Sequence, residues 1–93
     1  MSDEIQWACM IEAKLSGGRE LTDEEIDAFY EWDQDCAVGM RSGRCLVLFD
    51  VTGTDPGAGA TEGYRRWLEV APADATVDLV EIMTKERQGA DSN

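Results

Sequence analysis

Apolar and polar side chains alternate along residues 5–15, IQWACMIEAKL. Successive side chains of a β-strand point to opposite faces, so a period of two predicts a strand here. One face is wholly apolar, whereas the other mixes polar and apolar residues. The first face comprises Ile5, Trp7, Cys9, Ile11, Ala13 and Leu15, and the second Gln6, Ala8, Met10, Glu12 and Lys14.

Residues 21–35 are predicted to form a helix, and they open with a clear helix start signal. Thr22 is suited to cap the first turn, and Glu25 three residues later completes a capping box. Leu21 and Ile26 have the spacing of a hydrophobic staple. The stripe predicted to face the core comprises Ile26, Phe29 and Tyr30, with Trp32 to one side.

Two short apolar runs follow, residues 37–41 and 45–52, and the glycine-containing SGR between them predicts a hairpin. Residues 56–71 then show helical spacing. Asp55 is a good N-cap, and Pro56 suits the first helical position, where a missing N–H costs nothing. Pro72 is expected to end this helix. Its predicted core stripe comprises Ala60, Tyr64, Trp67, Leu68 and Ala71.

Residues 76–85 form the last predicted strand. The alternation of apolar and polar residues is interrupted at the adjacent apolar residues Leu79 and Val80, which predicts a bulge or an edge position. The order β-α-β-β-α-β predicts an α+β, ferredoxin-like fold. In this fold four antiparallel strands form one sheet with two helices on one face, and the first and third strands are central. Residues 1–86 are expected to form this single domain, and residues 87–93 a mobile polar tail.

The net charge of the 93-residue chain is −12. This charge opposes direct binding to nucleic acid and to anionic membrane surfaces. No apolar run is long enough to span a bilayer, and the acidic N-terminus lacks the pattern of a secretory signal, so a cytoplasmic location is expected. The chain has no histidine, which excludes histidine-dependent catalytic arrangements.

Three cysteines, Cys9, Cys36 and Cys45, are scattered along the chain without a CxxC pair. We interpret them as free and mostly buried thiols, because an odd number in a reducing compartment does not indicate disulfides. Three cysteines without histidine do not complete a zinc site. We therefore expect neither a metal nor a cofactor.

The stretch DPGAGATEGYRRWLEV has its glycines at 57, 59 and 63. This spacing departs from the G-x-G-x-x-G dinucleotide fingerprint, and no Gly-Lys pair provides a P-loop. The favoured interpretation is a helix face of small residues that lets the backbone approach the sheet. The other interpretation is an anion site helped by Arg65 or Arg66.

Acids spaced by four residues form a ridge along the first predicted helix: Asp23, Asp27, Glu31 and Asp35. Like charges at this spacing weaken a helix slightly, so helix stability does not explain them. They form either a solvated face that favours solubility or, with Trp32, a docking surface for a basic protein. Nucleic-acid mimicry is a weaker alternative, because phosphates in a duplex are more closely spaced.

The sheet face opposite Trp7 and Phe49 is predicted to be apolar at Ala8, Met10, Leu46 and Leu48. A solvated face should be polar, so an apolar patch indicates an interface. We expect a homodimer through this face, with a different protein partner or a covering tail or loop as alternatives. Further residues considered for the patch are Val38 or Met40 and Val80 or Ile82.

Three carboxylates, Glu12, Asp50 and Glu81, are candidates for acid–base chemistry on that same face. Carboxylates are abundant in this chain, so chance proximity is the better explanation. We therefore predict that the protein is not an enzyme.

The strings AKLSGGRELTDEEIDAF and VTGTDPGAGATEGYRRWLEV resemble a loose group of small acidic proteins of actinobacteria and their phages. The resemblance implies a ferredoxin-like fold and a phage or mobile-element origin, and it supplies no functional residues. The leading hypothesis is a non-enzymatic module that binds a host protein through the apolar sheet face and the acidic helix. The alternatives are a dimeric regulatory domain that binds a small ligand and a nucleic-acid mimic.

Overall fold

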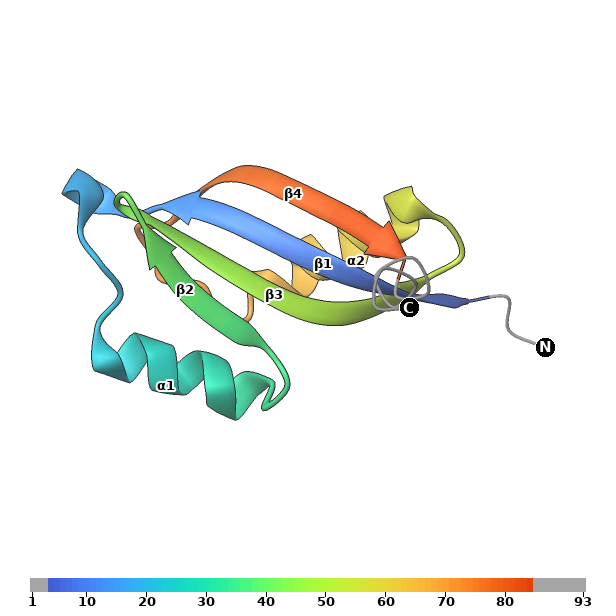
Figure 1. The fold of residues 1–93 in the computed structure, drawn as a ribbon, viewed down its shortest axis with the longest axis horizontal. Helices are drawn as coiled ribbons and strands as arrows, with labels where there is room; N and C mark the ends of the chain where they lie inside the picture. The colour runs from blue at the N-terminus through green and yellow to red at the C-terminus, as the bar shows by residue number, and fades with distance from the viewer. Residues whose placement is uncertain (1–3, 85–93) are drawn as a thin grey trace, which may run out of the picture.

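The computed structural model describes residues 4–84, which form one sheet and two helices (Figure 1). The predicted tail at 87–93 lies outside these residues. In chain order the elements are β1 (Ile5–Lys14), a 3₁₀ turn η1 (Ser16–Gly18), α1 (Asp23–Trp32), β2 (Ala37–Arg41), β3 (Arg44–Gly53), α2 (Pro56–Trp67) and β4 (Thr76–Thr84).

The strands form one antiparallel sheet in the order β2-β3-β1-β4, so the first and third strands are central, as predicted. This order, with the two helices between the strands, is the ferredoxin-like arrangement. The β2–β3 hairpin closes through two residues, Ser42 and Gly43, rather than the three predicted. Both have positive φ, 52° and 76°, as a type I′ turn requires.

Both helices begin at the predicted caps. The Thr22 hydroxyl accepts a hydrogen bond from the Glu25 N–H (3.1 Å), and the Glu25 carboxylate accepts one from the Thr22 N–H (2.9 Å). The Asp55 carboxylate accepts from the Ala58 N–H (2.8 Å), with Pro56 at the first helical position. Local hydrogen bonding therefore determines where each helix starts.

Both helices end earlier than predicted. α1 ends at Trp32, because the Asp33 carboxylate accepts from the Asp35 N–H (2.9 Å) and draws the chain into a turn. Asp35 is therefore not on the helix. α2 ends at Trp67, ahead of Pro72, and residues 68–70 form a turn.

The core lies between the sheet and α2, on the face of β1 and β3 that was predicted to be apolar. In Figure 1, α2 lies behind the sheet and α1 lies beside β2. The β1 and β3 side chains facing α2 are almost wholly buried. They include Trp7, Cys9, Ile11, Val47, Phe49 and Val51.

α2 packs against this face through Gly59, Gly63 and Trp67, which lie four residues apart. The buried face of α2 lies about one residue away from the core stripe that the sequence predicted. Two residues of that stripe are exposed, Tyr64 by 43% and Leu68 by 59%. The close approach of a glycine face is confirmed, although it uses Gly59 and Gly63 rather than Gly57. A Cβ added at Gly63 would stand 2.5 Å from the Cys9 Sγ.

α1 joins the core through two aromatic contacts. The ring of Phe29 stacks on Trp67 with centroids 5.7 Å apart, and Trp32 meets Phe49 edge to face at 5.0 Å. Phe29 is fully buried, whereas Tyr30, which was predicted to face the core, is 40% exposed. These contacts place both helices on the same side of the sheet.

β4 is an edge strand with a register shift, as predicted. The shift lies opposite Glu12 and Ala13, where the partner residue changes from Leu79 to Val77. Asp78 is thereby left as an extra residue on β4. Such a bulge interrupts the exposed ladder of an edge strand.

Arg19 ties the start of α1 to the connection between α2 and β4. Its guanidinium donates to both Glu25 carboxylate oxygens (2.9 and 3.0 Å) and to both Asp74 oxygens (2.7 and 2.9 Å). Asp74 also accepts from the Ser16 N–H (3.0 Å). The Arg19 hydrogen bonds are the largest cause that lowers the pKa of Glu25 and of Asp74, each to about 2.

We expect Gly63→Ala to lower the free energy of unfolding by about 1–3 kcal/mol. The new methyl would overlap the fully buried Cys9 sulfur, which outweighs the gain in helix propensity of about 1 kcal/mol. Gly57→Ala is the matched control, because its Cβ would meet only the Asp55 carboxylate, at 3.4 Å. Urea unfolding followed by circular dichroism measures both. Equal stability of the two variants would contradict this account of the packing.

Stability is expected to fall in acid through the Arg19 ion pairs. Because both folded-state pKa values lie below the ordinary values of 4.5 for Glu25 and 3.8 for Asp74, this stabilisation is complete above about pH 4.5. It is lost as the pH falls through about 2. Melting temperatures of the wild type and Arg19→Gln should therefore differ at pH 6 and converge towards pH 2. A gap that stays constant over this range would refute the assignment.

Candidate interaction surface

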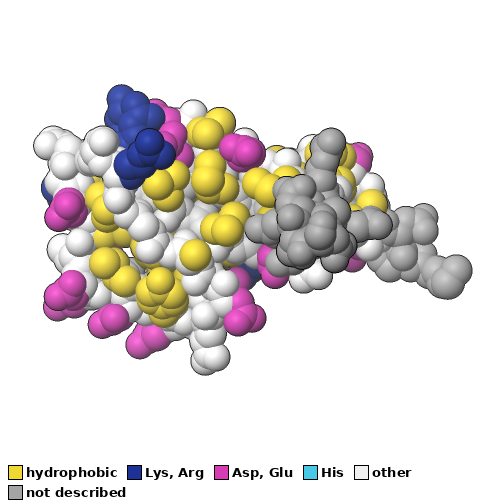
Figure 2. All heavy atoms as spheres, viewed as in Figure 1, with side chains coloured by type: hydrophobic (Ala, Val, Ile, Leu, Met, Phe, Trp, Pro, Cys, Tyr) yellow, Lys and Arg dark blue, Asp and Glu magenta, His cyan; other side chains and the backbone are white. Residues whose placement is uncertain are grey.

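The sheet face away from α2 carries a continuous apolar patch, the open face. Met10 on β1 lies in register with Leu48 on β3, and Leu48 is in turn paired with Ala37 on β2. Leu46, one strand period before Leu48, widens the patch along β3. Figure 2 shows this face, with hydrophobic side chains gathered at its centre and most acids towards its periphery.

The edge strands contribute different residues to the open face from those predicted. Val38 and Met40 pair with Val47 and Cys45 and therefore face α2. Val80 and Ile82 also face the core, opposite Ile11 and Cys9. Alternation then places other residues on the open face, namely Ala37 and Gly39 from β2, and Leu79, Glu81 and Met83 from β4.

Exposure differs among the residues predicted for this patch. Met10, Leu46 and Leu48 are partly exposed, whereas Ala8 is only 2% exposed and adds little surface. Leu79 is 43% exposed, which makes it the most exposed large apolar side chain of the patch. Leu79 and Met83 were not predicted for this patch. The sequence pattern does not show which face of the sheet the β4 side chains occupy on either side of the bulge.

Cations form a row across one end of the open face. Arg44 on β3 is in register with Arg41 on one side and Lys14 on the other. Like charges directly opposite one another are destabilising. Arg44 is partly neutralised by Glu12 (3.4 Å) and by the bulged Asp78 (3.2 Å). The open face therefore carries bases and acids in similar number on a protein whose net charge is −12.

The acidic ridge is only partly helical. Asp23, Asp27 and Glu31 are exposed on α1, and Asp35 is exposed in the turn that follows. Because α1 lies beside β2, these acids are outside the apolar patch (Figure 1). The structure does not bring them together with Met10, Leu46 and Leu48.

Trp32 lies in a cluster with Arg66 rather than on the acidic ridge. The Arg66 guanidinium lies over the Trp32 ring, 4.7 Å from its centroid, and also pairs with Asp33 at 3.5 Å. The Trp32 indole N–H donates to the Glu69 carboxylate (3.2 Å). The cluster links α1 to α2 through a cation–π contact and charged hydrogen bonds.

Arg65 and Arg66 make different contacts on α2. Arg65 is exposed and pairs with Glu62 and Glu69, while Arg66 is partly buried and donates to the Asp50 carbonyl (2.8 Å). Both guanidinium groups are thus bonded to groups of this chain. Anion binding at this position stays a prediction, and it would have to compete with these bonds.

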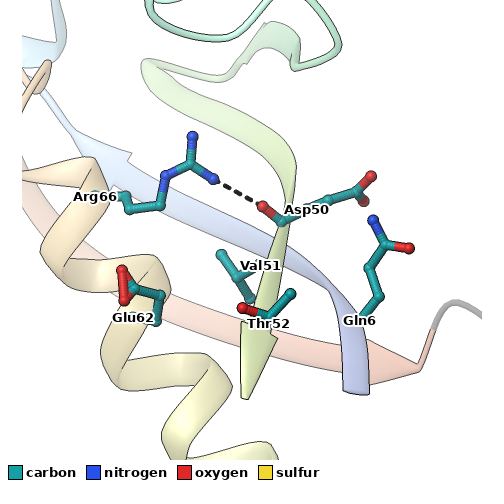
Figure 3. A pocket seen from close by; sticks show the side chains of 6 residues that line it. All are labelled: Gln6, Asp50, Val51, Thr52, Glu62 and Arg66. Atoms are coloured by element: carbon teal, nitrogen blue, oxygen red, sulfur yellow. Dashed lines mark hydrogen bonds between the residues drawn. The ribbon is translucent and has the colours of Figure 1, made fainter. Parts of the chain in front are cut away.

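A depression of about 280 Å³ lies beside the outer edge of β3. Figure 3 shows Arg66 and Glu62 projecting from α2 on one side, with Asp50 and Gln6 on the other. Its remaining lining residues are Val51 and Thr52. The depression lies beyond the end of β2, whose pairing with β3 stops at Leu48.

The three cysteines are free and buried, as expected. Burial raises the pKa of Cys9 to about 11 and also raises those of Cys36 and Cys45. Burial therefore disfavours the reactive thiolate form of each cysteine. Within residues 4–84, no group of three or more histidine, cysteine or acidic residues could hold a metal ion.

The three carboxylates considered for catalysis all have open-face register, but they are not cross-strand partners. Asp50 pairs with Ala8, Glu81 with Met10, and Glu12 with Leu46. Glu12 is instead bonded to Arg44. The arrangement offers no direct pairing of carboxylates.

No protein-family model matches the chain, and neither a curated protein nor a solved structure is significantly similar to it. No helix among the described residues is both long and apolar enough to cross a membrane.

Arg66→Met should destabilise the fold by about 1–3 kcal/mol, because it leaves the Asp50 carbonyl and the Asp33 carboxylate without the guanidinium. Arg65→Met is the matched control on the exposed side of the same helix, and its unfolding midpoint should hardly change. Chemical unfolding curves compare the two variants. Equal shifts would show that the cluster with Trp32 does not stabilise the fold.

Proposed function

We propose that this protein is a non-enzymatic protein-interaction domain that forms a homodimer through its open face. The proposal rests on one observation: the large apolar side chains of Met10, Leu46 and Leu48 are partly exposed on the open face of the central strands. Among residues 4–84, no helix packs on that face, since α1 and α2 both contact the opposite one. Covering such a face removes apolar surface from water.

The charge distribution favours a second copy as the occupant. Two chains with a net charge of −12 each repel one another unless they meet where little net charge resides. The open face meets this requirement, because Lys14, Arg41 and Arg44 balance its acids. The exposed acids of α1 would remain at the periphery of the dimer.

The same charges favour antiparallel alignment of the two sheets. With the strands of both copies parallel, the row formed by Arg41, Arg44 and Lys14 would face itself. With the strands antiparallel, this row faces the opposite end of the partner sheet, which carries Asp50. Two sheets packed face to face commonly align within about 30°, so this pairing is compatible with ordinary sheet packing.

The α1 acids then form a second outward surface. Asp23, Asp27 and Glu31 are exposed and lie beside the sheet rather than over it. In the dimer they keep a strongly negative exterior, which favours solubility and attracts basic proteins. A basic host protein is the partner that this surface would recognise.

Leu48→Asp is expected to raise the dimer dissociation constant at least about 100-fold, because it places a carboxylate in an apolar interface. Leu79→Asp on the same face should act in the same direction and, being exposed, should leave folding intact. Leu68→Asp is the matched control: Leu68 is 59% exposed and follows the last residue of α2, away from the open face. Sedimentation velocity over a concentration series gives the dissociation constants.

A wild-type protein that stays monomeric to millimolar concentration would overturn the dimer. Weakening by Leu68→Asp as strong as that by Leu48→Asp would also overturn it. Circular dichroism confirms that each variant is folded before its sedimentation is compared.

A further inference from the structure

We propose that the end of the sheet where β1 meets the β2–β3 hairpin binds the phosphate group of a small phosphorylated molecule. A cavity of about 220 Å³ lies at this end, and we call it the hairpin-end site. The residues that line it come from β1, from the turn η1 that follows, and from the hairpin: Lys14, Leu15, Gly18, Ser42, Gly43 and Arg44. The large apolar side chains of the open face do not line it, so this site is independent of the proposed dimer.

Cations are concentrated at this site in a chain that has few of them. The sequence has eight lysine and arginine residues against 20 acids. Three of the eight, Lys14, Arg44 and Arg41, nevertheless lie side by side on three adjacent strands. Figure 2 shows basic side chains gathered at one end of this face. Like charges opposite one another on neighbouring strands repel, and an anion held between them relieves that repulsion.

Two of these three cations are available to a ligand. Lys14 and Arg41 are exposed, and neither side chain forms an ion pair or a hydrogen bond with another of residues 4–84. Arg44 is bonded to Glu12 (3.4 Å) and to Asp78 (3.2 Å). Three cations and two carboxylates leave a net positive charge at this end of the sheet.

The hairpin turn adds neutral hydrogen-bond donors beside these charges. Ser42 and Gly43 form the type I′ turn, and their own N–H groups have no hydrogen-bond partner within residues 4–84. The exposed Ser42 hydroxyl has no partner among the same residues. Backbone N–H groups and serine hydroxyls, together with lysine and arginine, are the usual partners of phosphate oxygens.

Contacts within the chain hold both walls of the site in place. A Cβ added at Gly43 would stand 3.3 Å from the Gly18 carbonyl oxygen, so the hairpin turn lies directly against η1. η1 is held in turn by Asp74, whose carboxylate accepts from the Ser16 N–H (3.0 Å). Walls that are fixed before a ligand arrives reduce the entropic cost of binding.

Charge favours a small phosphorylated molecule over other anions. None of the described residues that line the cavity is acidic, whereas the depression between β3 and α2 is lined by Asp50 and Glu62. A phosphate dianion can pair with two cations and still accept neutral hydrogen bonds, which suits this donor set better than a single carboxylate does. Distant acids are screened beyond about 10 Å at 0.1 M salt. A nucleic-acid strand extends much further and would be repelled by them.

The test is a titration of ¹⁵N-labelled protein with inorganic phosphate and with phenyl phosphate at constant ionic strength, followed by NMR. The largest shifts are expected at the amides of Lys14, Ser42 and Gly43, with a dissociation constant of about 1 mM for inorganic phosphate. Phenyl phosphate should bind at least about threefold more tightly, because the cavity has room for a group attached to the phosphate.

A variant pair separates this site from the general charge of the protein. Lys14→Met removes one cation and should weaken binding of phenyl phosphate at least about fivefold, whereas Lys14→Arg should stay within about twofold of the wild type. Arg65→Met is the matched control, because it changes the net charge equally at an exposed position on α2. It should also stay within about twofold. Circular dichroism confirms that each variant is folded.

Absence of any shift at about 20 mM phenyl phosphate would overturn the proposal. Equal weakening by Lys14→Met and Arg65→Met would also overturn it, because binding would then depend only on net charge. Shifts confined to residues 62–66 would place the anion on α2 instead of at the hairpin end. Tighter binding of a short DNA duplex than of phenyl phosphate would refute a small molecule as the ligand.

Discussion

The close packing of α2 on the sheet is the constraint on which the rest of the structure depends. Gly59 lies against Trp7 and Gly63 against Cys9, where added Cβ atoms would stand 3.1 and 2.5 Å from the nearest side-chain atoms. The close approach of α2 to the sheet lets Trp67, one turn after Gly63, reach the core and stack on Phe29. The position of α1 follows, since Phe29 and Trp32 attach it to the sheet.

The polar groups around this packing are largely used within the chain. Arg19 connects α1 to the loop before β4, and Arg66 connects α2 to Asp33 and to the β3 backbone. No buried side-chain donor or acceptor among the described residues lacks a partner. The proposed protein–protein interactions depend instead on the partly exposed apolar side chains of the open face and on the exposed acids of α1.

Local signals in the sequence predicted the fold well where one pattern determined the structure. The alternation along β1 and the caps at Thr22 and Asp55 depend on neighbouring residues, so they could be read without tertiary information. The apolar character of Met10, Leu46 and Leu48 followed from the same alternation. Helix ends were predicted less well, because turn hydrogen bonds at Asp33 competed with a continuing helical pattern.

The sequence by itself determined the element order, the helix starts and which residues of the central strands share a face. These features depend on contacts a few residues apart or on strict alternation. Only the tertiary structure decided the phase of the edge strands, the buried side of α2 and the length of β3 left uncovered by β2. Edge strands pair on one side only, so their short apolar runs allow either phase until a neighbour sets the register. The buried side of α2 depended on glycines, whose missing side chains give no hydrophobic signal but permit the closest approach to Trp7 and Cys9.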